Sequence, residues 1–172
     1  YVFDLASYGG ILYVVGAFTV LDWYTRNKLA SFDTYDDYLL PFDPEPNGNV
    51  YSLYATDGIL YVGGLFSTIG GVTRNRIASF NTSDDTIRSF DGSAAGGAVN
   101  VLLGSGSYLY AGGYFSSLSG ITRNYFGVFS LANEGKITSI GSDGVGASNL
   151  PPSVKMIYAL APSGINVLNN QV

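Results

Sequence analysis

Three near-copies of one stretch of twenty-one residues occur along this chain. They read YVVGAFTVLDWYTRNKLASFD from Tyr13, YVGGLFSTIGGVTRNRIASFN from Tyr61 and YAGGYFSSLSGITRNYFGVFS from Tyr110. The copies start 48 and 49 residues apart. A period this regular indicates one structural unit written several times, so that each unit completes its hydrophobic core only by packing on a neighbouring unit.

Each unit contains four short runs in which apolar and small polar residues alternate, a pattern typical of half-buried strands. In the second unit the runs cover residues 50–55, 59–63, 76–81 and 86–90, and Thr56, Asp57 and Gly58 predict a tight hairpin turn between the first two. No segment has a sustained helical period. The sequence therefore predicts an all-β protein.

Four antiparallel strands repeated every 48–50 residues predict the blades of a β-propeller. The alternatives are a β-solenoid, whose coils are usually shorter, and a two-sheet sandwich, which needs no period. The expected domain is single, with blades at about residues 1–49, 50–98, 99–153 and, incomplete, 154–172. About three and a half blades fall short of a closed ring, which usually has four to eight. Either the chain is a piece of a longer propeller, or several copies assemble to close the ring.

The segment DGILYVGGLFSTIGGVTRNRIASFN resembles the delta-60 type β-propeller repeat of bacterial secreted and surface proteins. The resemblance covers residues 1–141 in three copies and 154–167 in part. It is weaker in the first copy, where Val15 replaces a Gly, and in the third, where Gly127 replaces an Ala. The resemblance implies an extracellular or cell-surface propeller, and it implies no defined catalytic residues.

Composition excludes several classes of function. The net charge is −5 and there are only eight Lys and Arg residues, without a cluster, so we expect neither a nucleic-acid partner nor a basic membrane-binding site. No apolar run reaches the ~20 residues that cross a bilayer. The chain has no Cys and no His, which removes thiol chemistry and the usual general base near pH 7. We expect no enzyme and no cofactor.

Four of the columns that are invariant in all three copies have a structural interpretation. The Gly would allow a close backbone approach, the Phe would fill the space between blades, and the Asn would hold a turn. The three Arg could bind an anion, but bonds to carbonyls or an Asp of the same or the next blade are favoured. These positions are Gly16, Gly64, Gly113, Phe18, Phe66, Phe115, Arg26, Arg74, Arg123, Asn27, Asn75 and Asn124.

Acidic pairs also recur, at Asp36-Asp37, Asp84-Asp85 and, as Asn133-Glu134, in the third unit. Turn chemistry is the favoured interpretation, because Asp is common in hairpin turns. Binding of Ca²⁺ and acid–base catalysis are the alternatives. Asn81-Thr82-Ser83 fits the short pattern of an N-glycosylation acceptor.

The repeat departs most clearly from its own pattern at Asp22, Trp23 and Tyr24. The same positions read Gly70-Gly71-Val72 and Ser119-Gly120-Ile121 in the other copies. Trp23 is the only Trp in the chain, and adjacent Trp and Tyr side chains suit stacking on a sugar or a protein contact. Alternatively, Trp23 covers a gap in its own blade or packs on a segment outside this chain.

Three classes of function follow from these residues. The favoured one is a non-catalytic binding or adhesion module at the cell surface or outside the cell, which contacts a protein or a glycan through loop aromatics. The second is a structural subunit of a surface layer, sheath or filament, in which copies or further blades pack together. The third, a glycosidase or lyase that uses only carboxylates, has no acidic residue that stands apart from the turns.

Overall fold

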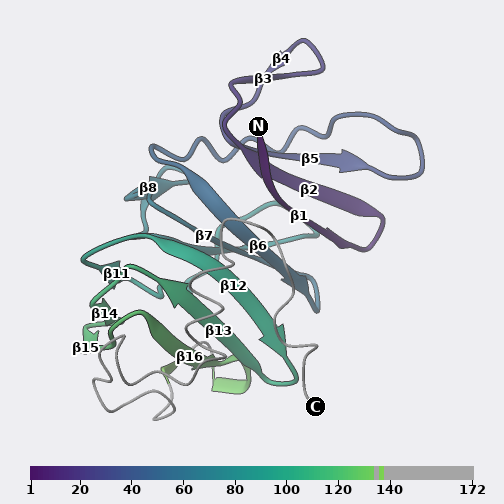
Figure 1. The fold of residues 1–172 in the computed structure, drawn as a ribbon. Helices are drawn as coiled ribbons and strands as arrows, with labels where there is room; N and C mark the ends of the chain where they lie inside the picture. The colour runs from purple at the N-terminus through teal and green to yellow at the C-terminus, as the bar shows by residue number, and fades with distance from the viewer. Residues whose placement is uncertain (134–135, 138–172) are drawn as a thin grey trace, which may run out of the picture.

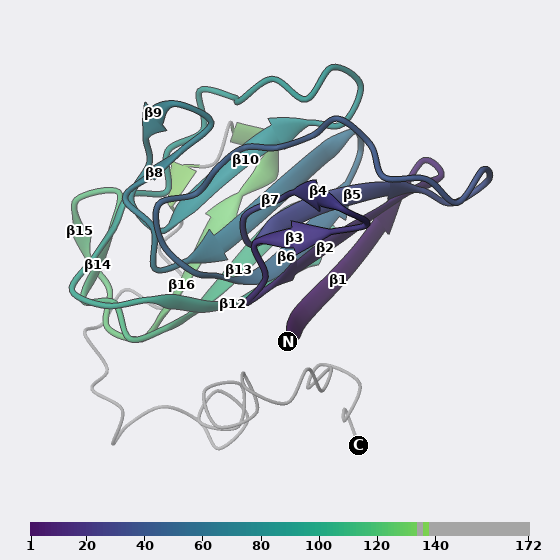
Figure 2. The ribbon, with the colours of Figure 1, turned by 90° about the horizontal axis from the view of Figure 1, so that it is seen from above.

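The computed structural model of this protein describes residues 1–133 and 136–137 and shows only β-structure apart from one short 3-10 turn (Figure 1). The predicted all-β fold is therefore confirmed. Three antiparallel sheets follow one another along the chain, and we call them blades 1, 2 and 3. Within the described residues they do not form a closed ring (Figures 1 and 2).

The three blades have the same construction. Each sheet begins with a long hairpin, and its third strand pairs with the second strand of that hairpin. Blade 1 consists of β1 (Val2–Tyr8), β2 (Ile11–Gly16) and β5 (Leu29–Asp33). Blade 2 consists of β6 (Val50–Thr56), β7 (Ile59–Gly64) and β10 (Ile77–Asn81). Blade 3 consists of β12 (Val99–Ser105), β13 (Tyr108–Gly113), β16 (Phe126–Ser130) and β17 (Lys136–Ile137).

A small second hairpin lies between the second and third strands of every blade, in a segment predicted as a loop. The hairpins are β3 (Val20–Leu21) with β4 (Tyr24–Thr25), β8 (Thr68–Ile69) with β9 (Val72–Thr73), and β14 (Ser117–Leu118) with β15 (Ile121–Thr122). The short strand β11 (Ala94–Ala95) adds to the third of them, and the 3-10 turn η1 (Leu131–Asn133) follows β16. The two-residue strands are too short to show an alternating pattern in the sequence.

The fourth strand predicted for blade 2, over residues 86–90, pairs with β10 as predicted but is shortened to a single antiparallel bridge. This segment makes a single bridge, between Phe80 and Ile87, and blade 1 has the corresponding bridge between Phe32 and Leu39. Asp85 precedes the bridge with φ +59°, and the side chain of Asp84 accepts hydrogen bonds from Thr86. The backbone ladder is made on both sides of the bridge, since Asn81 N–H donates to the Thr86 carbonyl at 2.9 Å and Arg88 N–H donates to the Ser79 carbonyl at 2.8 Å. A paired outer strand is present only in blade 3, as β17.

The blades stack through their broad faces, with the inner strands β1, β6 and β12 next to one another (Figure 1). One apolar cluster lies between blades 1 and 2, where Phe66 joins Tyr13 and Leu29. A second lies between blades 2 and 3, where Phe115 joins Tyr61 and Ile77. We call the face that a blade turns to its predecessor the leading face, and the face that it turns to its successor the trailing face.

The repeated Gly at the end of the second strand sits where the backbone is crowded. A Cβ on Gly64 would lie against the Asn49 carbonyl oxygen, inside van der Waals distance, and Gly16 meets the Tyr1 carbonyl in the same way. The Asn49 carbonyl also accepts a hydrogen bond from the residue after Gly64, since Leu65 N–H donates to it at 2.7 Å. Neither Gly has a positive φ. The Gly is needed for space rather than for conformational freedom.

Polar side chains link the inner strands of successive blades. The inner strands β6 and β12 have a bulge near their start, after Val50 and after Val99, and the amide of the Leu that follows the bulge bonds to the preceding blade. Leu53 N–H donates to Asp4 Oδ2 at 2.8 Å, and Leu102 N–H donates to Ser52 Oγ at 2.9 Å. Ser52 Oγ–H in turn donates to Asp4 Oδ2 at 3.1 Å. Asp4 and Ser52 occupy equivalent positions, so blades 1 and 2 each satisfy an amide of the blade that follows.

Candidate binding hairpin

The β3–β4 hairpin projects from blade 1 away from the other blades (Figure 1). Backbone hydrogen bonds hold its base: Arg26 N–H donates to Thr19, Lys28 N–H donates to Phe18, and Gly16 N–H donates to Lys28, all at 3.0–3.1 Å. The equivalent bonds hold the hairpins of blades 2 and 3. The tip of the hairpin is therefore carried on a fixed base.

Asp22 and Trp23 are the two central residues of the hairpin turn, since Leu21 pairs with Tyr24. Their φ angles are +46° and +68°. Two positive φ angles define the turn type that matches the twist of a two-residue hairpin, and this turn favours Gly, Asn or Asp. A Trp at the second position is therefore strained, by about 1–2 kcal/mol.

Trp23 is 95% exposed, and Tyr24 is 59% exposed. The expectation that Trp23 covers a gap in its own blade is therefore wrong. The other alternative, a contact with a segment outside this chain, is weakened by the equivalent positions. A Cβ at Gly71 or at Gly120 meets nothing within 4 Å, although a blade packs in front of each of them. The tip position is thus open around its Cβ even where the preceding blade is present.

Arg26 packs against one side of this hairpin. Its guanidinium carbon lies 6.0 Å from the centre of the Tyr24 ring, the distance of a cation–π contact. The same guanidinium donates to the Leu40 carbonyl at 2.9 Å and lies 3.7 Å from a carboxylate oxygen of Asp43. Tyr24 is therefore supported on one side by a cation that is itself anchored. Trp23, at the tip, has no such support.

The three repeated Arg residues bond to backbone carbonyls of their own blades. In each, Nη1 donates to the carbonyl of the preceding Thr at 2.8–2.9 Å, and Nη2 of Arg74 also reaches the Arg88 carbonyl. The bonds of Asn27 and Asn75 run through their main-chain carbonyls, to Leu29 N–H and Ala94 N–H. These contacts match the structural interpretation of the Arg. The Asn bonds use the backbone instead of the side chain.

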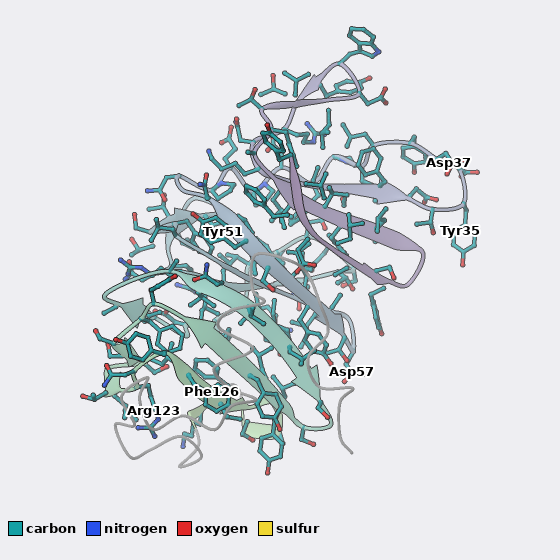
Figure 3. All side chains as sticks on the ribbon, viewed as in Figure 1. Tyr35, Asp37, Tyr51, Asp57, Arg123 and Phe126 are labelled. Atoms are coloured by element: carbon teal, nitrogen blue, oxygen red, sulfur yellow. The ribbon has the colours of Figure 1, made fainter. Side chains whose placement is uncertain are left out.

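The acidic pairs lie in the turns that follow the third strands. Asp37 and Asp85 have φ angles of +55° and +59°, and Figure 3 shows Asp37 and Tyr35 together in the loop beyond β5. Hydrogen bonds from Thr86 lower the pKa of Asp84, whereas burial and the adjacent Asp84 charge raise the pKa of Asp85. Among the described residues, no three acidic side chains come together as a metal site. Glu134 lies outside the described residues.

Asp85 also lines an open hollow between blades 1 and 2, opposite Pro41 and Asp43. Asp43 faces Arg26 there, as an ion pair. The candidate glycosylation residue Asn81 lies nearby on β10, and its Nδ2 donates to Thr86 Oγ1 at 2.8 Å. The amide nitrogen that a glycan would modify is thus engaged in a hydrogen bond within its own turn.

Sequence reasoning singled out the tip residues because they interrupt a repeat, but it missed three features of the site. These are the positive φ of Asp22 and Trp23, the exposed Val20 on the neighbouring strand, and the Arg26–Tyr24 contact. The Gly pair at the same place in the second copy was the available signal for the turn type. Nothing in the sequence signals the cation–π contact, because it depends on the path of the loop.

Repeated three-stranded and four-stranded sheets that stack face to face define this protein as one of the propeller type. In agreement, residues 55–87 match a family model described as a domain of unknown function (DUF5122) beta-propeller. The match covers the second blade from the end of β6 to the bridge at Ile87. The earlier resemblance to delta-60 repeats is consistent with this match. No curated protein matches the chain.

Among the described residues there is no helix of the length and apolarity that a membrane crossing requires.

Proposed function

We propose that this protein is a non-catalytic β-propeller module that acts outside the cell or at its surface and binds a partner through the β3–β4 hairpin. The observation that carries the proposal is Trp23, a large apolar side chain held in solvent at a position that favours Gly. The strain destabilises the free protein, and the exposed ring leaves apolar surface in water. A bound partner would gain free energy by burying that surface.

The size of the effect suits a contact residue. Burying a side chain of this kind contributes about 1.5–3 kcal/mol, and Trp and Tyr are enriched among the residues that dominate binding energy. Trp23 is the last residue of the turn and Tyr24 is the first residue of β4, so the two aromatic side chains are adjacent at the end of the hairpin. Asp22 supplies a hydrogen-bond acceptor beside the Trp23 ring. A flat apolar ring next to an acceptor suits a glycan or a protein surface.

The fluorescence of Trp23 can report on binding, because it is the only Trp in the chain. We expect the fluorescence of the free protein to show a solvated indole that acrylamide quenches easily. Screening on a glycan array and on whole-cell surface extracts should yield a ligand that shifts the emission to shorter wavelength and reduces quenching. A ligand that binds without changing either signal would contradict the proposed site.

The matched variants are Trp23→Gly and Tyr35→Ala. Gly occupies the tip in blade 2, so Trp23→Gly should fold normally while losing at least about tenfold in affinity. Tyr35 is also exposed but lies in the loop after β5 (Figure 3), so Tyr35→Ala should bind as the parent does. Equal affinity of the parent and Trp23→Gly would refute the proposal.

A structural subunit of an extracellular assembly is the second candidate. It is favoured by the apolar residues Val2 and Leu5, which are exposed on β1. This function would give polymers in electron micrographs of the purified protein, and Trp23→Gly would leave them unchanged.

A further inference from the structure

The leading face of blade 1 is an apolar surface that no other blade covers within the described residues, and of its residues only Val14 and Ala30 are buried. Val2 and Leu5 on β1 are 57% and 55% exposed. Their equivalents in blade 2, Val50 and Leu53, are 0% and 5% exposed. Phe18 is likewise only half-buried, while Phe66 is fully buried. The same residues therefore lie at the surface in one blade and in the core in the next.

This surface repeats the face that blade 2 already buries. The leading face of blade 2 contributes eight buried residues to its interface with blade 1, and seven of them recur unchanged in blade 1. The pairs are Val2 with Val50, Leu5 with Leu53, Leu12 with Leu60, Val14 with Val62, Phe18 with Phe66, Ala30 with Ala78 and Phe32 with Phe80. The eighth pair is Leu21 with Ile69. A surface that fits blade 2 therefore fits blade 1.

In both existing interfaces the cover is the trailing face of another blade. Tyr13, Val15 and Leu29 of blade 1 join the leading face of blade 2 in one cluster. At the next interface, a Cβ on Gly63 would lie 3.0 Å from Val99 and 3.1 Å from Leu102. The complement of this apolar surface is thus a second surface that the repeat itself encodes.

The linker between two blades pairs with the edge of the small hairpin of the following blade. In blade 2, the linker that leaves blade 1 runs along β8: Asn47 N–H donates to Thr68 at 3.1 Å, and Gly70 N–H donates to Pro44 at 2.6 Å. In blade 3, β11 pairs with β14 in the same way. Within the described residues, β3 pairs only with β4. A preceding blade would fill the face and this edge together.

One polar group on the open face needs no partner. The amides of Leu53 and Leu102 donate to a side chain of the preceding blade, but Leu5 N–H donates to Oδ1 of its own neighbour Asp4 at 2.9 Å. A carboxylate has two oxygens, so Asp4 serves its own strand and blade 2 at once. The occupant therefore has to bring an apolar face and does not have to bring an acceptor.

We propose that the leading face of blade 1, with the free edge of β3, is a docking surface for one more blade of this same repeat, joined ahead of β1 through its exit linker. A second copy of the chain could offer a trailing face, but it would not bring a linker that leads into β1. A preceding blade would cover the leading face with its trailing face and the β3 edge with its exit linker, as blade 1 does for blade 2.

The test is a chain in which residues 1–48 are duplicated ahead of Tyr1, which keeps the natural spacing of 48 residues between blades. Because the protein has no Cys, a single Leu5→Cys in the original blade 1 reports on the face. In the unextended chain, a maleimide should label this thiol rapidly. In the extended chain, labelling should slow by on the order of 100-fold, because it then requires the blades to open.

Tyr35→Cys in the original blade 1 is the control, because this exposed loop residue should be labelled at the same rate in both chains. A second readout is Leu5→Asp, which should lower the melting temperature of the extended chain by at least about 5 °C and leave that of the unextended chain within about 2 °C. Equal labelling of Leu5→Cys in the two chains would overturn the proposal. So would protection in the unextended chain that grows with concentration, which would assign the surface to a second copy.

Discussion

Blades 1 and 2 have nearly the same sequence on their leading faces, and yet the face is exposed in one and buried in the other. Leu5 and Leu53 are the clearest pair, since both lie directly after the bulge of an inner strand. The difference shows that the repeat specifies an interface between two blades rather than a self-contained blade. The energetic role of a repeat residue is therefore set by its neighbour as much as by its own strand.

The strongest test of this comparison removes the same side chain from both blades. Leu53→Ala should lower the free energy of unfolding by about 2–4 kcal/mol, because it leaves a cavity between blades 1 and 2. Leu5→Ala should cost less than about 1 kcal/mol, because its side chain is already in solvent. Urea denaturation of the two variants measures the difference, and equal losses would show that blade 1 is covered in solution.

The buried Tyr13 of blade 1 allows a second test, through the pH dependence of stability. Burial, with a smaller effect from the charge of Asp85, raises the pKa of Tyr13 to about 12. The unfolded chain releases this proton from about pH 10, so the unfolded state binds fewer protons between the two pKa values and stability falls as pH rises. By pH 12 the contribution of Tyr13 to stability should have fallen by about 2 kcal/mol.

Tyr13→Phe should remove this part of the alkaline loss, and urea denaturation from pH 9 to 12 would show it. The variant should be no less stable than the parent at pH 7, since the buried Tyr13 hydroxyl has no hydrogen-bond partner among the described residues. Tyr35→Phe, an exposed control, should follow the parent throughout. A Tyr13→Phe curve parallel to that of the parent would contradict the burial of this phenol.

The polar link between blades gives a smaller effect. Ser52→Ala removes the acceptor of the buried Leu102 amide, which should cost about 1–2 kcal/mol. Ser79 on β10 is also buried, but its hydroxyl has no partner in the described part of the chain, so Ser79→Ala should change stability by less than about 0.5 kcal/mol. Chemical denaturation of both variants separates the cost of losing the hydrogen bond to Leu102 from the cost of losing a buried hydroxyl group. Similar costs would argue against the link.

The smallest effect concerns the hairpin tips. Trp23→Gly should stabilise the protein by about 0.5 kcal/mol, because relief of about 1–2 kcal/mol of backbone strain exceeds the added entropy of the unfolded chain. Gly71→Trp, the reverse change in blade 2, should destabilise it by a similar amount. Thermal melts of the pair provide the measurement. A loss of stability in Trp23→Gly would mean that the indole packs on its own protein.

The sequence predicted the fold well where the repeat itself carries the information. The strands predicted at 50–55, 59–63 and 76–81 are present as β6, β7 and β10, because alternation and turn residues are local signals. The strand predicted at 86–90 is shortened to one bridge at Ile87, which follows the Asp84-Asp85 turn. The fourth unit, in residues 154–172, lies outside the described residues.

The candidate site was predictable in position but not in mechanism. Comparison of three copies located Trp23, whereas its turn geometry became evident only with the φ angles. The link through Asp4 and Ser52 was missed, although both are polar residues in an otherwise apolar inner strand. Its partners are 48–50 residues away, and no local pattern connects an Asp or Ser to the amide of the next unit.

The hydrogen bonds that Asp4 accepts from Leu53 and Ser52 accepts from Leu102 make the stability of the stacked blades depend on their order. In blade 3 the equivalent residue is Val101, which has no acceptor to offer. Exchanging blades 2 and 3, or copying blade 3 in tandem, would place a Leu amide behind a Val and leave it unbonded. Duplicating blade 2 would carry the Ser along with the unit. If such arrays grow by copying of units, this one residue makes some duplications better tolerated than others.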